Sequence, residues 1–159
     1  MSTTTAPLDF ELPNVGAGPD TFSPADADAE YLVLLLQRDY YCKKCRRQVQ
    51  SAKRRYDEFQ DANAEVVSVL PEPTDRTKKW QTSYDLPFPL LADEGKEVGD
   101  AMDQPERFGV LGSLHDLVGR MPEALVLDVE TGEVLFDHAG DSPGDRPDID
   151  ELLAAIPSA

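Results

Sequence analysis

Apolar residues fall along this chain in two kinds of pattern, short continuous runs and helical repeats. Residues 31–37 and 65–70 are almost continuously apolar, which is typical of strands that are buried on both faces of a sheet. Between these runs, apolar positions recur at spacings of 4, 3, 4 and 3, which predicts one face of an amphipathic helix. The positions are Cys45, Val49, Ala52, Tyr56 and Phe59. The pattern therefore predicts a strand, a helix and a second strand in succession.

Weaker patterns predict the remaining elements. Strands are expected at residues 8–12, at a short segment that ends in 90–91, and in a hairpin formed by 124–128 and 133–136. Helices are expected at 74–84 with Thr74 as the cap, at 94–102, and at 149–156, with Asp148 or Pro147 at the start of the last helix. We interpret residues 16–30 as a loop and leave 103–121 unassigned.

The order of these elements predicts the fold class. Strand–helix–strand units join parallel strands, and helices then cover both faces of the sheet. The final hairpin adds an antiparallel edge, so we expect an α/β protein with a central mixed sheet and helices on both faces. No internal repeat, low-complexity run or long linker interrupts residues 1–159, which predicts a single domain.

The charge of the chain excludes some classes of protein. Acidic residues outnumber basic residues by 31 to 15, and the formal net charge is −16. Such a surface repels phosphate backbones and anionic lipids, which argues against binding to nucleic acid or to a membrane. Salt screens the self-repulsion of the chain, since the Debye length is about 3 Å at molar salt. We therefore interpret the acid surplus as a halophilic adaptation. The alternative is an ordinary acidic protein. The first six residues carry no basic cluster and no apolar stretch follows them, so we expect no secretory signal and a cytoplasmic location.

One segment reverses this charge. Residues 38–55 contain eight basic residues and a single acidic residue, Asp39. The only cysteines of the chain, Cys42 and Cys45, lie inside this segment, between the predicted strand and the predicted helix. Amide groups at a helix N-terminus and nearby cations both favour a thiolate over a thiol. A spacing of three residues also allows the two sulfurs to meet in a disulfide.

Three kinds of site fit this cysteine pair. A redox-active dithiol is favoured, because the pair lies at the strand-to-helix turn of a β–α–β pattern. A metal site would need two further ligands, for which the chain offers His115 and His138. An inert pair, buried or bridged, is the third alternative, although charged neighbours such as Lys44 need water and argue against burial.

Four segments of the chain resemble one known superfamily. They are residues 32–36 running into Arg-Asp-Tyr-Tyr-Cys-Lys-Lys-Cys-Arg, residues 65–70 with the loop and helix that follow, Phe-Pro-Leu-Leu-Ala-Asp at 88–93, and Met-Pro-Glu-Ala-Leu-Val-Leu-Asp at 121–128 followed by Thr-Gly-Glu-Val. From about residue 8 to 156 the chain resembles the thioredoxin-fold superfamily. It is most similar to the peroxiredoxin-like redoxins of the alkyl hydroperoxide reductase/thiol-specific antioxidant group. The resemblance implies a thioredoxin-like fold.

The cysteine motif departs from that family's pattern. Peroxiredoxins place a proline, a threonine four residues on and the peroxide-attacking cysteine three further, where this chain has Arg38, Cys42 and Cys45. The arginine that peroxiredoxins carry before the last hairpin falls at Pro122, and Arg120 lies close enough to substitute. A cysteine pair together with this proline also resembles thioredoxin, and that likeness implies a cis peptide bond before the proline, beside the sulfurs.

The resemblance implies an oxidoreductase, an antioxidant enzyme of cell redox homeostasis, in one of two versions. In a peroxidase, Cys45 attacks a peroxide and Cys42 resolves the sulfenic acid to a disulfide, while Arg120 or Arg38 stabilises the developing charge. In a thioredoxin-like reductase, Cys42 attacks a disulfide substrate and Cys45 displaces the product. Lys44 is a candidate for tuning the thiolate.

Both versions cycle through one disulfide, which an external thiol donor such as a thioredoxin reduces, and neither needs a metal or an organic cofactor. A homodimer is compatible with either version. A third alternative is a non-catalytic binding or redox-sensing module on the same fold, in which a partner protein recognises whether the two cysteines form a disulfide. Trp80 is expected to pack in the core instead of binding substrate.

Overall fold

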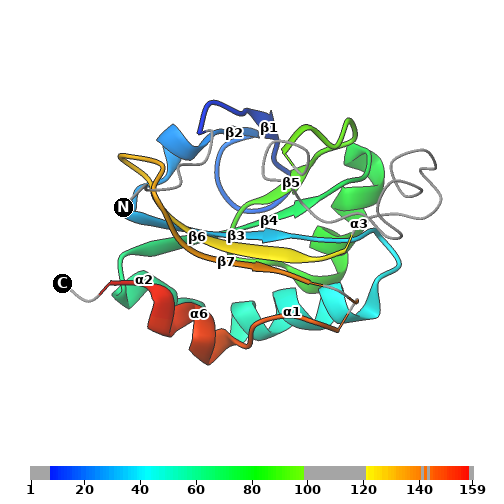
Figure 1. The fold of residues 1–159 in the computed structure, drawn as a ribbon. Helices are drawn as coiled ribbons and strands as arrows, with labels where there is room; N and C mark the ends of the chain where they lie inside the picture. The colour runs from blue at the N-terminus through cyan, green and yellow to red at the C-terminus, as the bar shows by residue number, and fades with distance from the viewer. Residues whose placement is uncertain (1–7, 99–120, 141, 143, 158–159) are drawn as a thin grey trace.

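A five-stranded sheet forms the centre of the protein in a computed structural model that describes residues 8–98, 121–140, 142 and 144–157 (Figure 1). The strands lie in the order β5-β4-β3-β6-β7. Their bounds are β3 Tyr31–Leu36, β4 Ala64–Leu70, β5 Leu90–Ala92, β6 Glu123–Asp128 and β7 Val134–Ala139. The two apolar runs of the sequence thus form adjacent central strands, as predicted.

The sheet is mixed. β3, β4 and β5 run parallel, with Val33 opposite Val66 and Ser68 opposite Leu90. β6 runs antiparallel to β3, and β7 runs antiparallel to β6, so the predicted hairpin supplies one edge of the sheet. This arrangement confirms the predicted α/β class.

The helices lie close to their predicted positions, with one break. They are α1 (Lys43–Arg54), α2 (Tyr56–Asp61), α3 (Thr74–Tyr84) and α6 (Ile149–Ala155). The single helix predicted through Phe59 is divided at Arg55, whose backbone has φ −114° and ψ 20°. Val49, Ala52 and Phe59 are nevertheless all buried. The helical repeat therefore predicted correctly which face is buried, but it could not predict where the hydrogen-bond ladder is interrupted.

The predicted caps are confirmed at one helix and wrong at another. Asp148 caps α6, since its carboxylate accepts a hydrogen bond from the Glu151 amide at 2.8 Å. The N-cap of α3 is Pro73 and not Thr74. The hydroxyl of Thr77 donates to the Pro73 carbonyl at 3.0 Å, so a residue inside the helix supplies the side-chain contact at this end.

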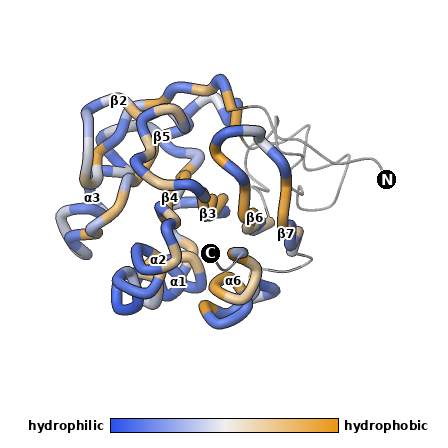
Figure 2. The backbone as a smooth tube through the Cα atoms, turned by 90° about the vertical axis from the view of Figure 1, so that its left-hand side faces the viewer, coloured by the Kyte–Doolittle hydropathy of each residue, from blue (hydrophilic) through white to orange (hydrophobic). Residues whose placement is uncertain are grey.

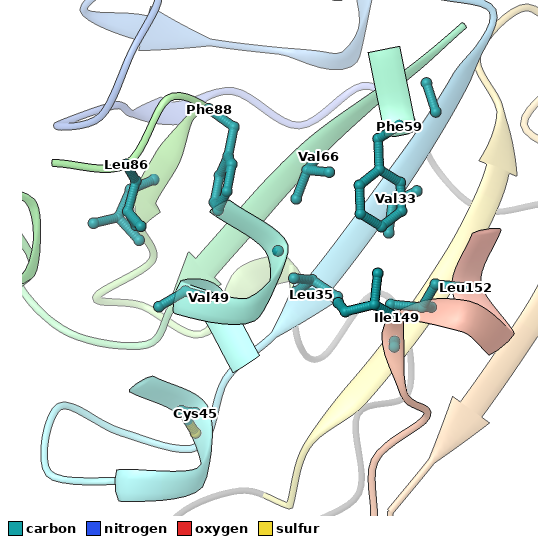
Figure 3. Packing of buried hydrophobic residues seen from close by; sticks show 14 of the residues in the cluster. Val33, Leu35, Cys45, Val49, Phe59, Val66, Leu86, Phe88, Ile149 and Leu152 are labelled. Carbon is teal, nitrogen blue, oxygen red and sulfur yellow. The ribbon is translucent and has the colours of Figure 1, made fainter. Parts of the chain in front are cut away.

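Alternate residues of β3 point to opposite faces of the sheet and enter two apolar clusters. Val33 and Leu35 pack with residues that include Val49 of α1, Phe59 of α2 and Leu152 of α6 (Figure 3). These three helices lie together on one side of the sheet, whereas the N-terminal hairpin, formed by β1 (Leu12–Pro13) and β2 (Thr21–Phe22), lies on the other (Figure 1). The cluster on the hairpin side includes Leu32, Leu34, Leu36, Leu12 and Phe22. Hydrophobic colour gathers on the central strands, while α1 and α3 are largely hydrophilic (Figure 2).

The N-terminal segment differs from its prediction. β1 (Leu12–Pro13) pairs with β2 (Thr21–Phe22), so the strand predicted at 8–12 lies later, and the predicted loop at 16–30 contains β2 and the 3-10 helix η1 (Pro24–Asp26). Asn14 fixes this turn, because its Oδ1 accepts hydrogen bonds from the amides of Gly16 and Leu90 at 2.9 and 3.0 Å. A side-chain amide determines this pairing, so the alternation of apolar residues does not reveal it.

The helix predicted at 94–102 begins at Glu97. The Asp93 carboxylate accepts hydrogen bonds from the amides of Glu97 and Val98, both at 2.9 Å, and so caps this start. The remainder of that helix and the unassigned segment 103–120 lie outside the described residues. Within the described part of the chain, no helix is long and apolar enough to cross a membrane.

Candidate active site

The two cysteines lie where the chain passes from β3 to α1. Cys42 occupies the N-cap position of α1, and Cys45 lies in its first turn. The two sulfurs are joined in a disulfide across a Cα–Cα distance of 5.3 Å. The predicted meeting of the two sulfurs at a helix N-terminus is therefore present, and the described state is the oxidised one.

Backbone amides on both sides of the turn from β3 to α1 point at the sulfurs. Cys42 Sγ accepts a hydrogen bond from the Cys45 amide at 3.1 Å, so the cysteine itself caps the helix. Cys45 Sγ accepts a hydrogen bond from the Arg38 amide at 3.4 Å. Donors in these positions favour a thiolate once the disulfide opens.

An arginine from a distant part of the chain completes the site. Arg146 Nη2 lies 2.7 Å from Cys45 Sγ and 3.5 Å from Cys42 Sγ. Arg146 Nη1 donates to Gln37 Oε1 at 3.0 Å and to Gln48 Oε1 at 2.8 Å. The two glutamine carbonyls therefore orient the guanidinium so that its other nitrogen faces the sulfur pair.

Arg146 carries its charge in a poorly hydrated position. Burial, and to a smaller extent the like charge of Arg38, lowers the pKa of the Arg146 guanidinium to about 10. The group stays protonated at neutral pH, so a positive charge lies against the sulfurs. A thiolate at either cysteine would supply the opposite charge, which couples the burial of Arg146 to the ionisation of the pair.

The loop between β7 and α6 holds Arg146 in place. His138 Nε2 lies 2.8 Å from Asp145 Oδ1, which ties the residue before Arg146 to β7. The Gly140 amide donates to the Pro122 carbonyl at 2.8 Å. A Cβ at Gly140 would lie 2.5 Å from the Asp145 carbonyl oxygen and 2.9 Å from Pro122 Cγ, so this close approach requires glycine.

The loop before Cys42 is held through the backbone of Tyr40. The Tyr40 carbonyl accepts hydrogen bonds from Arg46 Nη2 at 2.7 Å and from Trp80 Nε1 at 3.0 Å, and its amide donates to Glu72 Oε2 at 2.9 Å. Trp80 is 1% exposed and lies in the core cluster, which confirms its predicted packing role. These contacts anchor the cysteine loop to α1 and α3.

Both sulfurs are shielded from solvent in this state. Cys45 is 0% and Cys42 is 4% exposed. Cys45 borders the apolar core on one side (Figure 3) and contacts Arg146 on another. Arg146 and Gln48 are themselves partly exposed, so polar side chains that reach solvent lie beside the disulfide.

The structure brings some of the predicted supporting residues to the sulfurs and not others. Arg38 contributes its backbone amide, while its side chain lies 4.0 Å from Asp39. Lys44 is exposed and lines a neighbouring groove. Arg120 and His115 lie outside the described residues. Between described residues, no group of three or more His, Cys, Asp or Glu side chains gathers at one point, and His138 is paired with Asp145.

The prediction of a cis bond at Pro122 is wrong. No peptide bond between described residues is cis, so the Met121–Pro122 bond is trans, which is the commoner state of such bonds. The register sets Glu123 opposite Leu36 and leaves Pro122 level with the start of the cysteine loop. There Pro122 packs against Gly140 and supports the loop that carries the site arginine.

Arg146 is the residue that sequence reasoning missed. Its segment is rich in Gly, Pro and Asp and is typical of a surface turn. One signal was available, because between residues 140 and 151 Arg146 is the only basic residue beside five acidic residues.

The sequence matches one family of known proteins. The profile of the AhpC/TSA family matches residues 3–131. Peroxiredoxin Q, chloroplastic, from Sedum lineare is 34% identical over 86 residues, which cover 53% of this chain and 41% of that protein. Peroxiredoxin Q, chloroplastic, from Populus jackii is 29% identical over 113 residues, which cover 64% and 53%. The chain spans about half the length of these curated relatives.

Solved structures share the fold over nearly the whole chain. Peroxidoxin BcpB from Mycobacterium tuberculosis has a TM-score of 0.78 at 21% identity and covers 97% of this chain and 94% of its own. AhpC from Enterococcus faecalis has a TM-score of 0.80 at 16% identity, with coverage of 97% and 89%. Peroxiredoxin Q from Xanthomonas campestris has a TM-score of 0.75 at 16% identity, with coverage of 95% and 93%. The predicted thioredoxin-like fold is confirmed.

Proposed function

Because this chain belongs to the AhpC/TSA family, we propose that it is a thiol-dependent peroxidase that reduces peroxides through Cys42 and Cys45. One observation carries the proposal: the disulfide lies at the N-terminus of α1, with the Arg146 guanidinium 2.7 Å from Cys45 Sγ. A nucleophile, a group that stabilises its thiolate and a resolving partner are thus close together.

The proposed cycle has three steps. The Cys45 thiolate attacks one peroxide oxygen, the O–O bond breaks, the sulfur is oxidised to a sulfenic acid, and the leaving oxygen takes a proton to become an alcohol or water. The Cys42 thiol then attacks the sulfenic sulfur, an S–S bond forms and water leaves. A thioredoxin-type dithiol, or two monothiols, finally reduces this disulfide and is itself oxidised.

The contacts favour Cys45 as the attacking residue. Its sulfur has the shortest contact with Arg146 and also accepts from the Arg38 amide, whereas Cys42 Sγ lies 3.5 Å from the same arginine nitrogen. A cation and an amide donor both lower the pKa of a thiol. Arg146 can also stabilise charge on the leaving peroxide oxygen, so in this proposal it takes the role predicted for Arg120 or Arg38.

The cycle makes few demands on partners. Both cysteines belong to one chain, so a homodimer is compatible with the reaction but not needed for it. A reducing compartment such as the cytoplasm supplies the thiols that reopen the disulfide, and we propose that location for the enzyme.

Peroxide consumption by the wild-type protein and two serine variants tests the proposal. Without a thiol donor, the reduced wild-type protein should consume one peroxide per chain and form the disulfide. C42S should consume one peroxide and accumulate a sulfenic acid that dimedone traps at Cys45. C45S should lose at least about 10³-fold in rate, because the nucleophile is gone. A wild-type rate in C45S would exclude Cys45 as the nucleophile.

A protein-disulfide reductase is the second candidate function. Cys42, and not Cys45, occupies the N-cap of α1 and is the less buried sulfur, at 4% against 0% exposure. In that reaction the Cys42 thiolate attacks a substrate disulfide and Cys45 displaces the product. If the protein is a reductase, wild-type protein reduces insulin and C42S does not. A wild-type protein that turns over peroxide and leaves insulin intact removes this candidate.

A further inference from the structure

A groove adjoins the disulfide on the side of Arg146. It has a volume of about 420 Å³ and lies between α1 and residues 146–150. This volume is typical of sites for small molecules. The lining residues from α1 and the position after it are Lys44, Arg47, Gln48, Ser51, Arg54 and Arg55.

Exposed cations follow one face of this groove. Lys44, Arg47 and Arg54 are spaced by three and seven residues, so their side chains lie on the same face of α1, and all three are exposed. Arg55 forms ion pairs with carboxylates. Among the described residues, neither Lys44 nor Arg47 forms one. The lining also includes the carboxylates of Asp148 and Asp150, but five cations outnumber them, so the groove presents a net positive charge to solvent.

This local charge is opposite in sign to the charge of the whole molecule. The chain carries a net charge of −16, and residues 38–55 hold eight of its 15 basic residues. Clustered charge in a concave surface raises the local concentration of ions of the opposite sign. An anion is therefore attracted to this groove although it is repelled by most of the surface.

The groove and the disulfide share two side chains. Arg146 lines the groove and contacts Cys45 Sγ at 2.7 Å, and Gln48 lines the groove and accepts a hydrogen bond from Arg146 at 2.8 Å. A molecule in the groove thus lies one side chain from the sulfur pair. Since the pair is already oxidised in this state, the molecule that reacts next with it is a reductant and not a peroxide.

We propose that this groove binds the carboxylate of a small anionic thiol that reduces the Cys42–Cys45 disulfide. The inference rests on the proposed peroxidase, since it names the class of electron donor in that cycle. The thiolate of the ligand attacks one cysteine sulfur, forms a mixed disulfide and releases the other cysteine as a thiolate. A second ligand thiolate attacks the mixed disulfide, which frees the second cysteine and yields the ligand disulfide. Two thiols thereby supply the two electrons.

Three small thiols of different charge test the proposal. Mercaptoacetate, 2-mercaptoethanol and cysteamine carry a carboxylate, a hydroxyl and an ammonium group, and each reduces the purified oxidised protein at low ionic strength. Each rate per thiolate is divided by the rate of the same thiol on an uncharged small disulfide, which removes the intrinsic difference in thiolate nucleophilicity. We expect mercaptoacetate to react about tenfold faster than cysteamine. The preference should shrink as the Debye length falls from about 10 Å at 0.1 M salt to about 3 Å at 1 M. The net charge of the chain predicts the reverse order, and that order would overturn the proposal.

Charge-reversal variants test whether the preference for mercaptoacetate over cysteamine arises in the groove. R47E and R54E should each bring the ratio of mercaptoacetate to cysteamine rates close to one, whereas K79E, which makes the same change of charge at an exposed position of α3, should leave the ratio unchanged. The ratio cancels any effect of a variant on the reactivity of the sulfurs. Equal losses in R47E and K79E would overturn the proposal. No peroxide enters this assay, so a protein without peroxidase activity still gives a readable ratio, and failure of the two proposals is distinguishable.

Discussion

Two ionisable groups are partly buried at opposite ends of the central strands. Glu65 lies near the start of β4, opposite Leu32, whereas Arg146 contacts Gln37 just beyond the end of β3. Burial raises the pKa of the Glu65 carboxyl and lowers the pKa of the Arg146 guanidinium to about 10. The protein environment therefore pushes each group towards its neutral form.

The contacts of the two groups differ. One carboxylate oxygen of Glu65 accepts hydrogen bonds from the Tyr56 hydroxyl at 2.7 Å and from the Val66 amide at 3.1 Å. Arg146 uses one nitrogen on two glutamine carbonyls and directs another at the sulfurs. A shifted pKa alone therefore does not identify a functional group, because only Arg146 faces atoms that can react.

Of the changes at these two groups, replacing Arg146 with methionine should have the largest effect. Without the guanidinium, the pKa of the Cys45 thiol should rise, because the cation that favours its thiolate is gone, and peroxide reduction at pH 7 should slow by about 10–100-fold. The pH dependence of iodoacetamide alkylation, measured in C42S and in C42S/R146M, reports this pKa. R146K should recover only part of the rate, because a lysine ammonium group cannot replace the planar guanidinium, which contacts two glutamine carbonyls and a cysteine sulfur at once.

R54M provides the control for this comparison. It removes an exposed cation from the same helix face that carries the groove, and it should leave the pH dependence of Cys45 alkylation essentially unchanged, because solvent screens this charge. If R146M and R54M change the pKa of the Cys45 thiol equally, Arg146 acts only as one surface charge among several, and its direct contact with the sulfur has no special effect.

The reduction potential should show a smaller effect of the same residue. Arg146 faces uncharged sulfurs in the disulfide but a thiolate after reduction, so it stabilises the reduced state more than the oxidised state. Its loss should lower the potential by about 30 mV, the equivalent of about 1.4 kcal/mol for two electrons. Equilibration of wild-type and R146M protein with dithiothreitol buffers measures the difference. A higher potential in R146M would contradict this assignment.

Glu65 should give the smallest effect, and on stability alone. Its folded-state pKa is raised, so its contribution to stability is present below its ordinary pKa of 4.5 and is lost as the pH rises through the folded value. E65Q keeps an acceptor for Tyr56 without the charge. At pH 7 its free energy of unfolding, measured by denaturant titration, should exceed that of the wild type by up to about 1 kcal/mol, and near pH 4 the two values should be equal.

E58Q is the matched control for Glu65. Arg55 lowers the pKa of the exposed Glu58 carboxyl, so removal of this charge should give no gain in stability at pH 7. A loss of stability in E65Q that is the same at both pH values would mean that hydrogen-bond geometry, and not desolvation, dominates at this position.

The parts of the site that sequence predicted are those set by local chemistry. The run before the cysteines, their spacing of three and the helical repeat after them place both sulfurs at a helix N-terminus without reference to the rest of the fold. The Asp148 cap was predictable for the same reason, since a cap joins residues three positions apart.

The parts that sequence did not predict depend on distant segments meeting. Arg146 is 101 residues from Cys45, and its position follows from the docking of α6 and from the close approach of Gly140 to Pro122. The pairing of β1 with β2 likewise depends on Asn14, whose Oδ1 accepts from an amide 76 residues away. No periodicity within one element contains such contacts.

The great separation of Arg146 from the cysteines along the chain has a consequence during synthesis. A ribosome adds both cysteines 101 residues or more before this arginine. Until residue 146 has been added and the last helix has closed over the sheet, the two cysteines lack the cation that lies beside them in the folded protein. In the proposed peroxidase, we therefore expect full reactivity towards peroxide only after the end of the chain has folded.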